Sequence, residues 1–116
     1  MGKGINSRAK GKRGELELAE FLREHGYADA RRGQQYSGTE TSADILVTGI
    51  SEDWHIECKR QETIQLLAWV KQALRDKGPG QAPVVMHRTS DHPWLATIML
   101  DDFLKLLLVR SLPHAR

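Results

Sequence analysis

The sequence is poor in the features of secreted and membrane proteins. Its 116 residues include a single cysteine, Cys58, so no disulfide can form within the chain, and a reducing compartment is favoured. No apolar run is long enough to cross a bilayer. The first residues are basic and contain glycine, and no apolar segment follows them, so we expect no secretory signal, no membrane partner and a cytoplasmic location.

Several site chemistries also lack their residue patterns. The five histidines are spread along the chain without the paired spacing of a zinc site; they are His25, His55, His87, His92 and His114. There is no glycine-rich phosphate loop, no Ser-His-Asp arrangement that can be singled out, and no internal repeat. Zinc hydrolases, P-loop proteins and serine hydrolases are therefore not indicated.

The composition is that of an ordinary globular protein, but its charge is unevenly placed. With 40% hydrophobic and 28% charged residues, we expect one domain, 1–116, with a modest core and a flexible basic tail over residues 1–6. The net charge is only +2, yet five basic residues precede the first acidic one: Lys3, Arg8, Lys10, Lys12 and Arg13. Arg31 and Arg32 form a second cluster. Such clusters suit a phosphate backbone, although an isolated one is more often a solvated tail.

Hydrophobic periodicity predicts a helix, three strands, a second helix, two strands and a last helix. The expected ranges are about 7–25, 27–32, 43–47, 54–60, 62–77, 82–88, 94–98 and 103–110. Gly26 suits the end of the first helix, and Asp101 or Asp102 is expected to cap the last. The many leucines of the last helix indicate a packing or dimer face.

The first helix has an acidic residue on the side that faces the sheet. Helical spacing aligns Glu15 with apolar residues and two glycines: Gly11, Gly14, Leu18, Ala19 and Leu22, with Phe21 at the margin. Three other acidic residues should point away, namely Glu17, Glu20 and Glu24. A lone buried charge is expensive, so Glu15 needs a partner. Either an arginine at the helix margin pairs with it, or it faces a metal site, which carboxylates elsewhere in the chain favour.

The second helix has an apolar stripe of its own, made of Leu66, Leu67, Val70, Ala73 and Leu74. On this assignment Gln65, Trp69 and Gln72 lie off the stripe.

The stretch from Asp44 to Lys59 carries most of the chemistry. It reads as two strands joined by a turn at Gly49, and a hairpin there would bring Asp44 near Glu57. Alternation divides the second strand between a core face and a polar face. The core face holds Trp54, Ile56 and Cys58, and the polar face holds His55, Glu57 and Lys59. Two carboxylates and a lysine at one place suit a hard divalent cation and a phosphate.

As an isolated tripeptide, Glu57-Cys58-Lys59 is more often an ion pair on a strand than a site. An aspartate at a strand start, a gap of twelve residues and Glu-x-Lys on the next strand together resemble the PD-(D/E)XK nuclease superfamily, with Ala43 where proline is usual. The likeness extends to Arg13-Gly14-Glu15, Arg31-Arg32 before Ser37-Gly38, Gln72-Ala73, a Pro-Val-Val strand and a strand containing Trp94. The Holliday-junction-resolvase-like branch, with its small phage members, is the most similar.

This resemblance implies an α/β fold with a restriction-endonuclease-like αβββαβ core, in which helices flank a mixed central sheet. It also implies a metal-dependent DNA endonuclease. Mg²⁺ or Mn²⁺ would be held by Asp44, Glu57 and the backbone carbonyl of Cys58, and Glu15 would complete the shell directly or through water. Lys59 would orient or deprotonate the attacking water. Gln72 would support that water or Lys59. The expected DNA contacts are Lys10, Lys12, Arg13, Arg31, Arg32 and Ser37.

The activity implied is that of a Holliday junction resolvase, and two alternatives remain open. One is another structure-selective, nicking or restriction-type endonuclease, and the other is a nucleic-acid-binding module without catalysis, against which the complete acidic set and Lys59 argue. Two symmetric cuts need two sites, so we predict a homodimer, with the last helix or the Trp94 strand as interface. His55 either contacts DNA or only flanks the site, the loop 33–42 either contacts phosphates or is a plain turn, and Cys58 is expected in the core.

Overall fold

The computed structural model of the protein describes residues 3–33 and 43–111. The predicted order of the elements is confirmed. They are α1 (Lys3–Glu24), β1 (Arg31–Arg32), β2 (Ile45–Leu46), β3 (Trp54–Arg60), α2 (Leu66–Asp76), β4 (Ala82–Arg88), β5 (Leu95–Ile98) and α3 (Leu100–Ser111). The first six form the αβββαβ core that the sequence predicts.

The five strands form one mixed sheet in the order β1-β2-β3-β4-β5. Only β3 and β4 are parallel, and the other neighbours are antiparallel. A parallel pair cannot be joined by a tight turn, so the chain crosses over through α2 between the two strands. The fold class is therefore α/β with a mixed sheet flanked by helices, as predicted.

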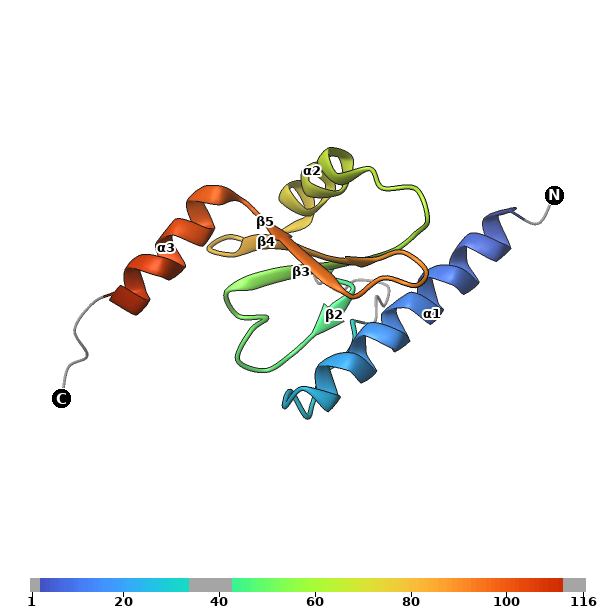
Figure 1. The fold of residues 1–116 in the computed structure, drawn as a ribbon, viewed down its shortest axis with the longest axis horizontal. Coiled ribbons are helices and arrows are strands. Elements are labelled where there is room, and N and C mark those ends of the chain that lie inside the picture. The colour runs from blue at the N-terminus through green and yellow to red at the C-terminus, as the bar shows by residue number, and fades with distance from the viewer. Residues whose placement is uncertain (1–2, 34–42, 112–116) are drawn as a thin grey trace.

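Helices α1 and α2 cover opposite faces of this sheet (Figure 1). On the α1 side, three residues of that helix pack on the sheet in a core made of Leu18, Ala19, Leu22, Ala30, Ile45, Val47, Ile56 and Val84. On the other side, Trp69 and Ala73 of α2 pack on Val85 of β4. The central strands are thus covered twice. The polar face that the sequence predicts for His55 and Glu57 is not open to solvent, because both side chains are buried on the α2 side of the sheet.

Helix α1 is longer than predicted. It begins at Lys3, within the range expected to be a flexible tail, and its N-terminal half extends beyond the sheet (Figure 1). Starting a helix is costly but adding turns is not, so the packed segment around Leu18 can propagate the helix toward the N-terminus. At the other end Gly26 has a φ of 101°, a conformation that glycine adopts readily, which agrees with its predicted role as the stop.

The predicted strand over residues 27–32 is mostly a turn. The amide of Tyr27 bonds the carbonyl of Leu22, and the amide of Ala30 bonds the carbonyl of Tyr27, so only Arg31 and Arg32 are left to pair with β2. Helix α2 likewise starts at Leu66, four residues later than expected.

The predicted apolar stripe of α2 is out of phase. Trp69 is buried, and its ring lies 5.4 Å from that of His87 on β4, whereas Leu67 is 77% exposed. The large indole covers more of the sheet than a leucine does, so the helix turns Trp69 inward and leaves Leu67 and Leu74 toward water. The corrected face also brings Gln72 to the rim of the sheet.

Helix α3 projects away from the sheet at the opposite end of the molecule from the start of α1 (Figure 1). It begins at Leu100, so Asp101 and Asp102 lie in its first turn and do not cap it as predicted. Seven of its large apolar side chains are exposed: Leu100, Phe103, Leu104, Leu106, Leu107, Leu108 and Val109. Among the described residues no helix is long and apolar enough to span a membrane.

Candidate active site

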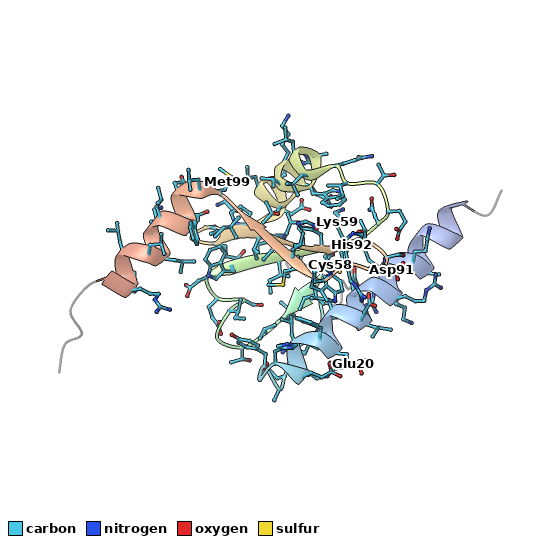
Figure 2. All side chains as sticks on the ribbon, in the orientation of Figure 1. Glu20, Cys58, Lys59, Asp91, His92 and Met99 are labelled. Carbon is cyan, nitrogen blue, oxygen red and sulfur yellow. The ribbon has the colours of Figure 1, made fainter. Side chains whose placement is uncertain are left out.

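A cleft of about 1110 Å³ opens between α1, the C-terminal end of β3 and α2. Five residues that the sequence predicts for the site line it: Glu15, Asp44, Cys58, Lys59 and Gln72. They come from four different elements or their ends, and 57 positions separate the first from the last. In Figure 2 the labelled Cys58 and Lys59 lie near the centre of the molecule, between α1 and α2.

The hairpin between β2 and β3 places Asp44. Ile45 pairs with Ile56, so Asp44 stands opposite Glu57, as the sequence predicts. The Asp44 amide donates to the Ile56 carbonyl (3.0 Å), and the Asp44 carboxylate accepts a hydrogen bond from the Cys58 amide (2.8 Å). Both main chain and side chain of Asp44 are therefore fixed on β3. Gly33 packs so closely that a Cβ there would lie 2.2 Å from the Ala43 carbonyl oxygen, which restricts that position to glycine.

The pKa of the Asp44 carboxyl group is strongly perturbed. Its pKa is raised from 3.8 to about 8, first by burial and then by the negative charge of Glu57, with a smaller contribution from Glu15. The hydrogen bond from the Cys58 amide opposes this shift but does not cancel it. The negative charges of Glu57 and Glu15 therefore favour the protonated form of Asp44, and a divalent cation would relieve the same repulsion.

Glu57 lies beneath the cleft and is only 1% exposed. Its Oε2 accepts a hydrogen bond from Nε2 of His55 at 2.8 Å. Ligand atoms of His55, Glu57 and Asp76 lie within 4.8 Å of one another. Sequence reasoning did not find this group, because Asp76 is on α2 and only the crossover brings it to β3. Contact between His55 and DNA is excluded by its 2% exposure.

Lys59 and Gln72 meet as the resemblance implied. The Lys59 ammonium donates to Oε1 of Gln72 at 2.8 Å. The expected position of Gln72 off the buried stripe was an error of helix phase. With Trp69 inward, Gln72 stands one turn further along at the edge of the same face, where it reaches the cleft.

Glu15 pairs with an arginine, which is one of the two alternatives that the sequence left open, and it also lines the cleft. Nε of Arg32 donates to its Oε1 at 2.8 Å, and the charge of Glu15 also raises the pKa of Asp44 across the cleft. The pair is largely shielded, with side-chain exposures of 30% for Arg32 and 17% for Glu15. Arg32 therefore holds Glu15 in this structure. Arg31 turns outward to Asp29.

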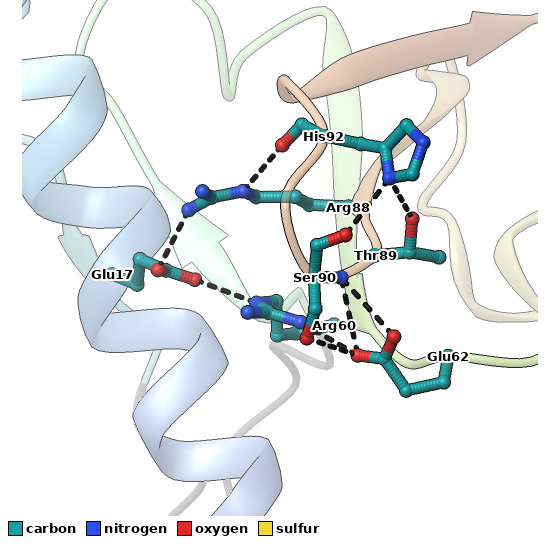
Figure 3. A network of polar contacts seen from close by, with 7 residues as sticks. All are labelled: Glu17, Arg60, Glu62, Arg88, Thr89, Ser90 and His92. Atoms are coloured by element: carbon teal, nitrogen blue, oxygen red, sulfur yellow. Dashed lines mark hydrogen bonds and ion pairs between the residues drawn. The ribbon is translucent and has the colours of Figure 1, made fainter.

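A second acidic residue of α1 bonds to the sheet, which the sequence did not predict. Glu17, expected to point away, accepts from Nε of Arg60 (3.0 Å) and from Arg88 (2.8 Å), the paired last residues of β3 and β4 (Figure 3). The signal was not local, since these partners are 43 and 71 residues distant. Glu20 and Glu24 are exposed as predicted, and Glu20 points away from the sheet in Figure 2.

Gly14 lets α1 approach β3 at the same place. A Cβ on Gly14 would lie 2.7 Å from the Cβ of Arg60. Gly11, which helical spacing also places on the inward side, makes no such approach, because a Cβ there would meet nothing within 4 Å. The contact at Gly14 sets the height of Glu15, the next residue, above the sheet.

Basic side chains flank the cleft on the projecting part of α1. Lys10, Lys12 and Arg13 are exposed, and Lys10 and Arg13 line the cleft. Ser37, also predicted to contact DNA, lies outside the described residues, as does most of the loop 33–42. Cys58 packs against the α1-side core, and burial raises the pKa of its thiol, which agrees with a packing role.

The comparisons with known proteins agree with this geometry. A family model described as "Phage putative PDDEXK endonuclease" matches residues 6–115. The chain therefore belongs to this family of PD-(D/E)XK endonucleases, as its sequence predicted. Among solved structures, the chain resembles Hjc, a Holliday junction resolvase from the archaeal hyperthermophile Archaeoglobus fulgidus, with a TM-score of 0.52, 23% identity and 75% of each chain covered. That likeness shows a shared fold. None of the curated proteins matches the sequence.

Proposed function

We propose that this PD-(D/E)XK endonuclease hydrolyses DNA phosphodiester bonds with the help of Mg²⁺ or Mn²⁺, and that its preferred substrate is a four-way Holliday junction. The observation that carries the proposal is the convergence of Glu15, Asp44, Lys59 and Gln72 on one cleft. A structural ion pair needs two of these groups, whereas phosphodiester hydrolysis uses all of them.

The oxygen donors fit a hard divalent cation. Asp44 and Glu57, which interact closely enough for Glu57 to raise the pKa of Asp44, would be the main ligands. The backbone carbonyl of Cys58 and the carboxylate of Glu15, directly or through water, would complete the set. When bound, such an ion polarises the phosphate and acidifies a water molecule, so no histidine base is required.

Lys59 is the cation that acts on the substrate. Its ammonium has three N–H donors, of which Gln72 engages one, and the others remain for the attacking water and a phosphate oxygen. Gln72 fixes the direction of those two. The lysine would thereby orient the water and offset the negative charge that develops on the phosphate in the transition state.

DNA would reach the cleft along the exposed half of α1, where Lys10, Lys12 and Arg13 present positive charge beside the site. Arg31, exposed at the start of β1, would contact a phosphate as well. Ser37 keeps its predicted role as a phosphate contact. Arg32 would act mainly through Glu15, because that ion pair occupies its guanidinium.

A junction substrate and a two-fold dimer belong together in this proposal. Two strands cut symmetrically need two sites, and we treat residues 1–116 as one domain with one site. The named activity of Hjc, which shares the fold, supports the choice of substrate. The exposed apolar side of α3 supports a dimer interface there. Trp94 is less suitable, since it already packs against Phe21 of α1.

The test is cleavage of a labelled four-way junction and a linear duplex of the same sequence, in Mg²⁺ and in EDTA. We expect the wild type to cut the junction in Mg²⁺ and not in EDTA. Asp44→Asn and Lys59→Ala should lose this activity and still bind the junction. Equal cutting of both substrates would favour a general or restriction-type endonuclease. Binding without cleavage in Mg²⁺, or in Mn²⁺ used in its place, would favour the non-catalytic module.

A further inference from the structure

The buried histidine on β3 contacts a proposed metal ligand directly. His55 is 2% exposed and Glu57 is 1% exposed, and the two are adjacent on the α2 face of the strand. An ionised carboxylate is only an acceptor, so Nε2 of His55 donates the 2.8 Å hydrogen bond to Oε2 of Glu57. No role of His55 in DNA contact is possible at this depth.

Glu57 has a neighbour on each of two sides. His55 donates a hydrogen bond to its carboxylate, and Asp44 lies near enough on the side of the cleft for the charge of Glu57 to raise the pKa of Asp44. A glutamate has several rotatable bonds and would sample other rotamers without such contacts. The bond to His55 selects a rotamer that keeps the carboxylate next to Asp44.

The same group could in principle hold an ion of its own, since Asp76 completes a set of three ligand atoms within 4.8 Å. The observed contacts favour a hydrogen-bonded support instead. His55 and Glu57 satisfy each other directly, and among the described residues no buried side-chain nitrogen or oxygen lacks a partner.

We propose that His55 is a positioning residue, which fixes the carboxylate of Glu57 beside Asp44 and so assembles the ligand pair before a cation binds. The proposal rests on the proposed function, because Glu57 matters to a cation only if the cleft binds one. Outer-shell partners of this kind typically change metal affinity by about 10–100-fold when they are removed.

The test measures Mn²⁺ affinity without DNA, by calorimetric titration of the full chain. We expect His55→Phe to weaken Mn²⁺ binding about tenfold or more, and His55→Gln, whose amide places an N–H donor near the position of Nε2, to recover most of the affinity. Asp44→Asn should abolish binding. Circular dichroism and thermal unfolding establish that each variant is folded.

His87 offers a matched control. It is also buried, lies beside Lys59 on the neighbouring strand and faces α2, but it bonds Thr97 rather than a carboxylate. His87→Phe should disturb the packing to a similar extent and leave the Mn²⁺ affinity within about twofold of the wild type. Junction cleavage should follow the Mn²⁺ affinities: His55→Phe should need a higher Mg²⁺ concentration for cleavage than the wild type, and His87→Phe should not.

Three results would overturn the assignment. One is an unchanged Mn²⁺ affinity in His55→Phe, and another is an equal loss in His55→Phe and His87→Phe. The third is a second bound ion that is lost in Asp76→Asn and in His55→Phe but kept in Asp44→Asn. That result would show that His55, Glu57 and Asp76 form a metal site of their own. If the wild type binds no Mn²⁺, or Asp44→Asn binds it normally, the proposed function fails as well, so the two failures are distinguishable.

Discussion

The two faces of β3 differ in what they bury. Toward α1 the strand presents Trp54, Ile56 and Cys58 to an apolar core. Toward α2 it presents His55, Glu57 and Lys59, which are bonded to other polar groups and lie at or under the cleft. Both faces are covered, but only the first is covered by apolar contacts alone.

This difference separates stability from function along a single strand. Apolar burial contributes directly to the free energy of folding, whereas burial of carboxylates consumes part of it. The pKa of Asp44, raised to about 8, reflects this cost, because burial disfavours the ionised carboxylate. We therefore expect substitutions on the α1 face to unfold the protein, and substitutions on the α2 face to disable the site while leaving or increasing stability.

The largest expected effect is on the α1 face. Ile56 is fully buried, so Ile56→Ala should lower the free energy of unfolding by about 2–5 kcal/mol through lost contacts and a cavity. Glu57→Gln, one residue further, should change it by less than about 1 kcal/mol. Urea unfolding in EDTA measures both values. If Ile56→Ala and Glu57→Gln lowered the free energy of unfolding equally, the two faces of β3 would not differ in their contribution to stability.

Asp44 gives the next effect, which depends on pH. Its pKa is about 8 in the folded protein and near 3.8 when unfolded, so the folded state binds the proton more tightly. The stability that protonated Asp44 provides is complete below about pH 4 and is lost as the pH rises through 8. The wild type should therefore lose stability between pH 5 and pH 9 in the absence of metal, whereas Asp44→Asn has no proton to lose at this position. The difference in free energy of unfolding between the two should shift in favour of Asp44→Asn by on the order of 3 kcal/mol over this range.

Thermal unfolding in EDTA across that range is the measurement, with Asp101→Asn on the exposed first turn of α3 as the control. A stability difference between Asp44→Asn and the wild type that stays constant from pH 5 to pH 9 would show that the carboxylates do not interact as the structure places them. Added Mg²⁺ should restore the stability of the wild type at pH 9 and leave that of Asp44→Asn unchanged.

Helix α3 provides a third apolar surface, which the described residues of the chain leave uncovered. If it is the dimer interface, Leu104→Lys should raise the dimer dissociation constant about tenfold or more by placing a charge among leucines. Lys105→Ala, on the polar side of the same helix, should not. Sedimentation equilibrium gives both constants. A wild type that stays monomeric with junction DNA would contradict the paired-cut proposal.

The smallest effect should come from the link between α1 and the strand ends. Glu17→Gln removes the charge that pairs with Arg60 and Arg88, and these side chains are 26–39% exposed, so a loss of only about 0.5–1 kcal/mol is expected. Glu20→Gln, exposed on the outer side of α1, is the control and should have no measurable effect. A loss as large as that of Ile56→Ala would mean that polar contacts, rather than the apolar core, hold α1 in place.

Local patterns in the sequence were sufficient for much of the site. Alternation along 54–60 and a turn at Gly49 place Asp44 opposite Glu57, and helical spacing places Glu15 inward. These relations depend on neighbouring residues and on the regular geometry of strands and helices. The order of the elements follows from the same periodicities and is confirmed.

The features that sequence reasoning missed depend on contacts between distant segments. A strand with one polar face reads the same whether that face meets water or a second helix, so the burial of His55 and Glu57 was not visible. The partners of Glu17 are too distant to be inferred from spacing. The phase of α2 was wrong because counting apolar residues cannot show that Trp69, rather than Leu67, fits against His87. The start of α1 at Lys3 is not marked by apolar periodicity in the sequence.

The central claim is that side chains from separate elements act together through one cation. The most direct measurement is the single-turnover rate of junction cleavage in Mg²⁺ for Glu15→Gln, Asp44→Asn and the double variant. Residues that act as a unit are strongly non-additive, so the account predicts that the double variant is no slower than Asp44→Asn alone. Losses that multiply would show that Glu15 and Asp44 act independently and would contradict the account.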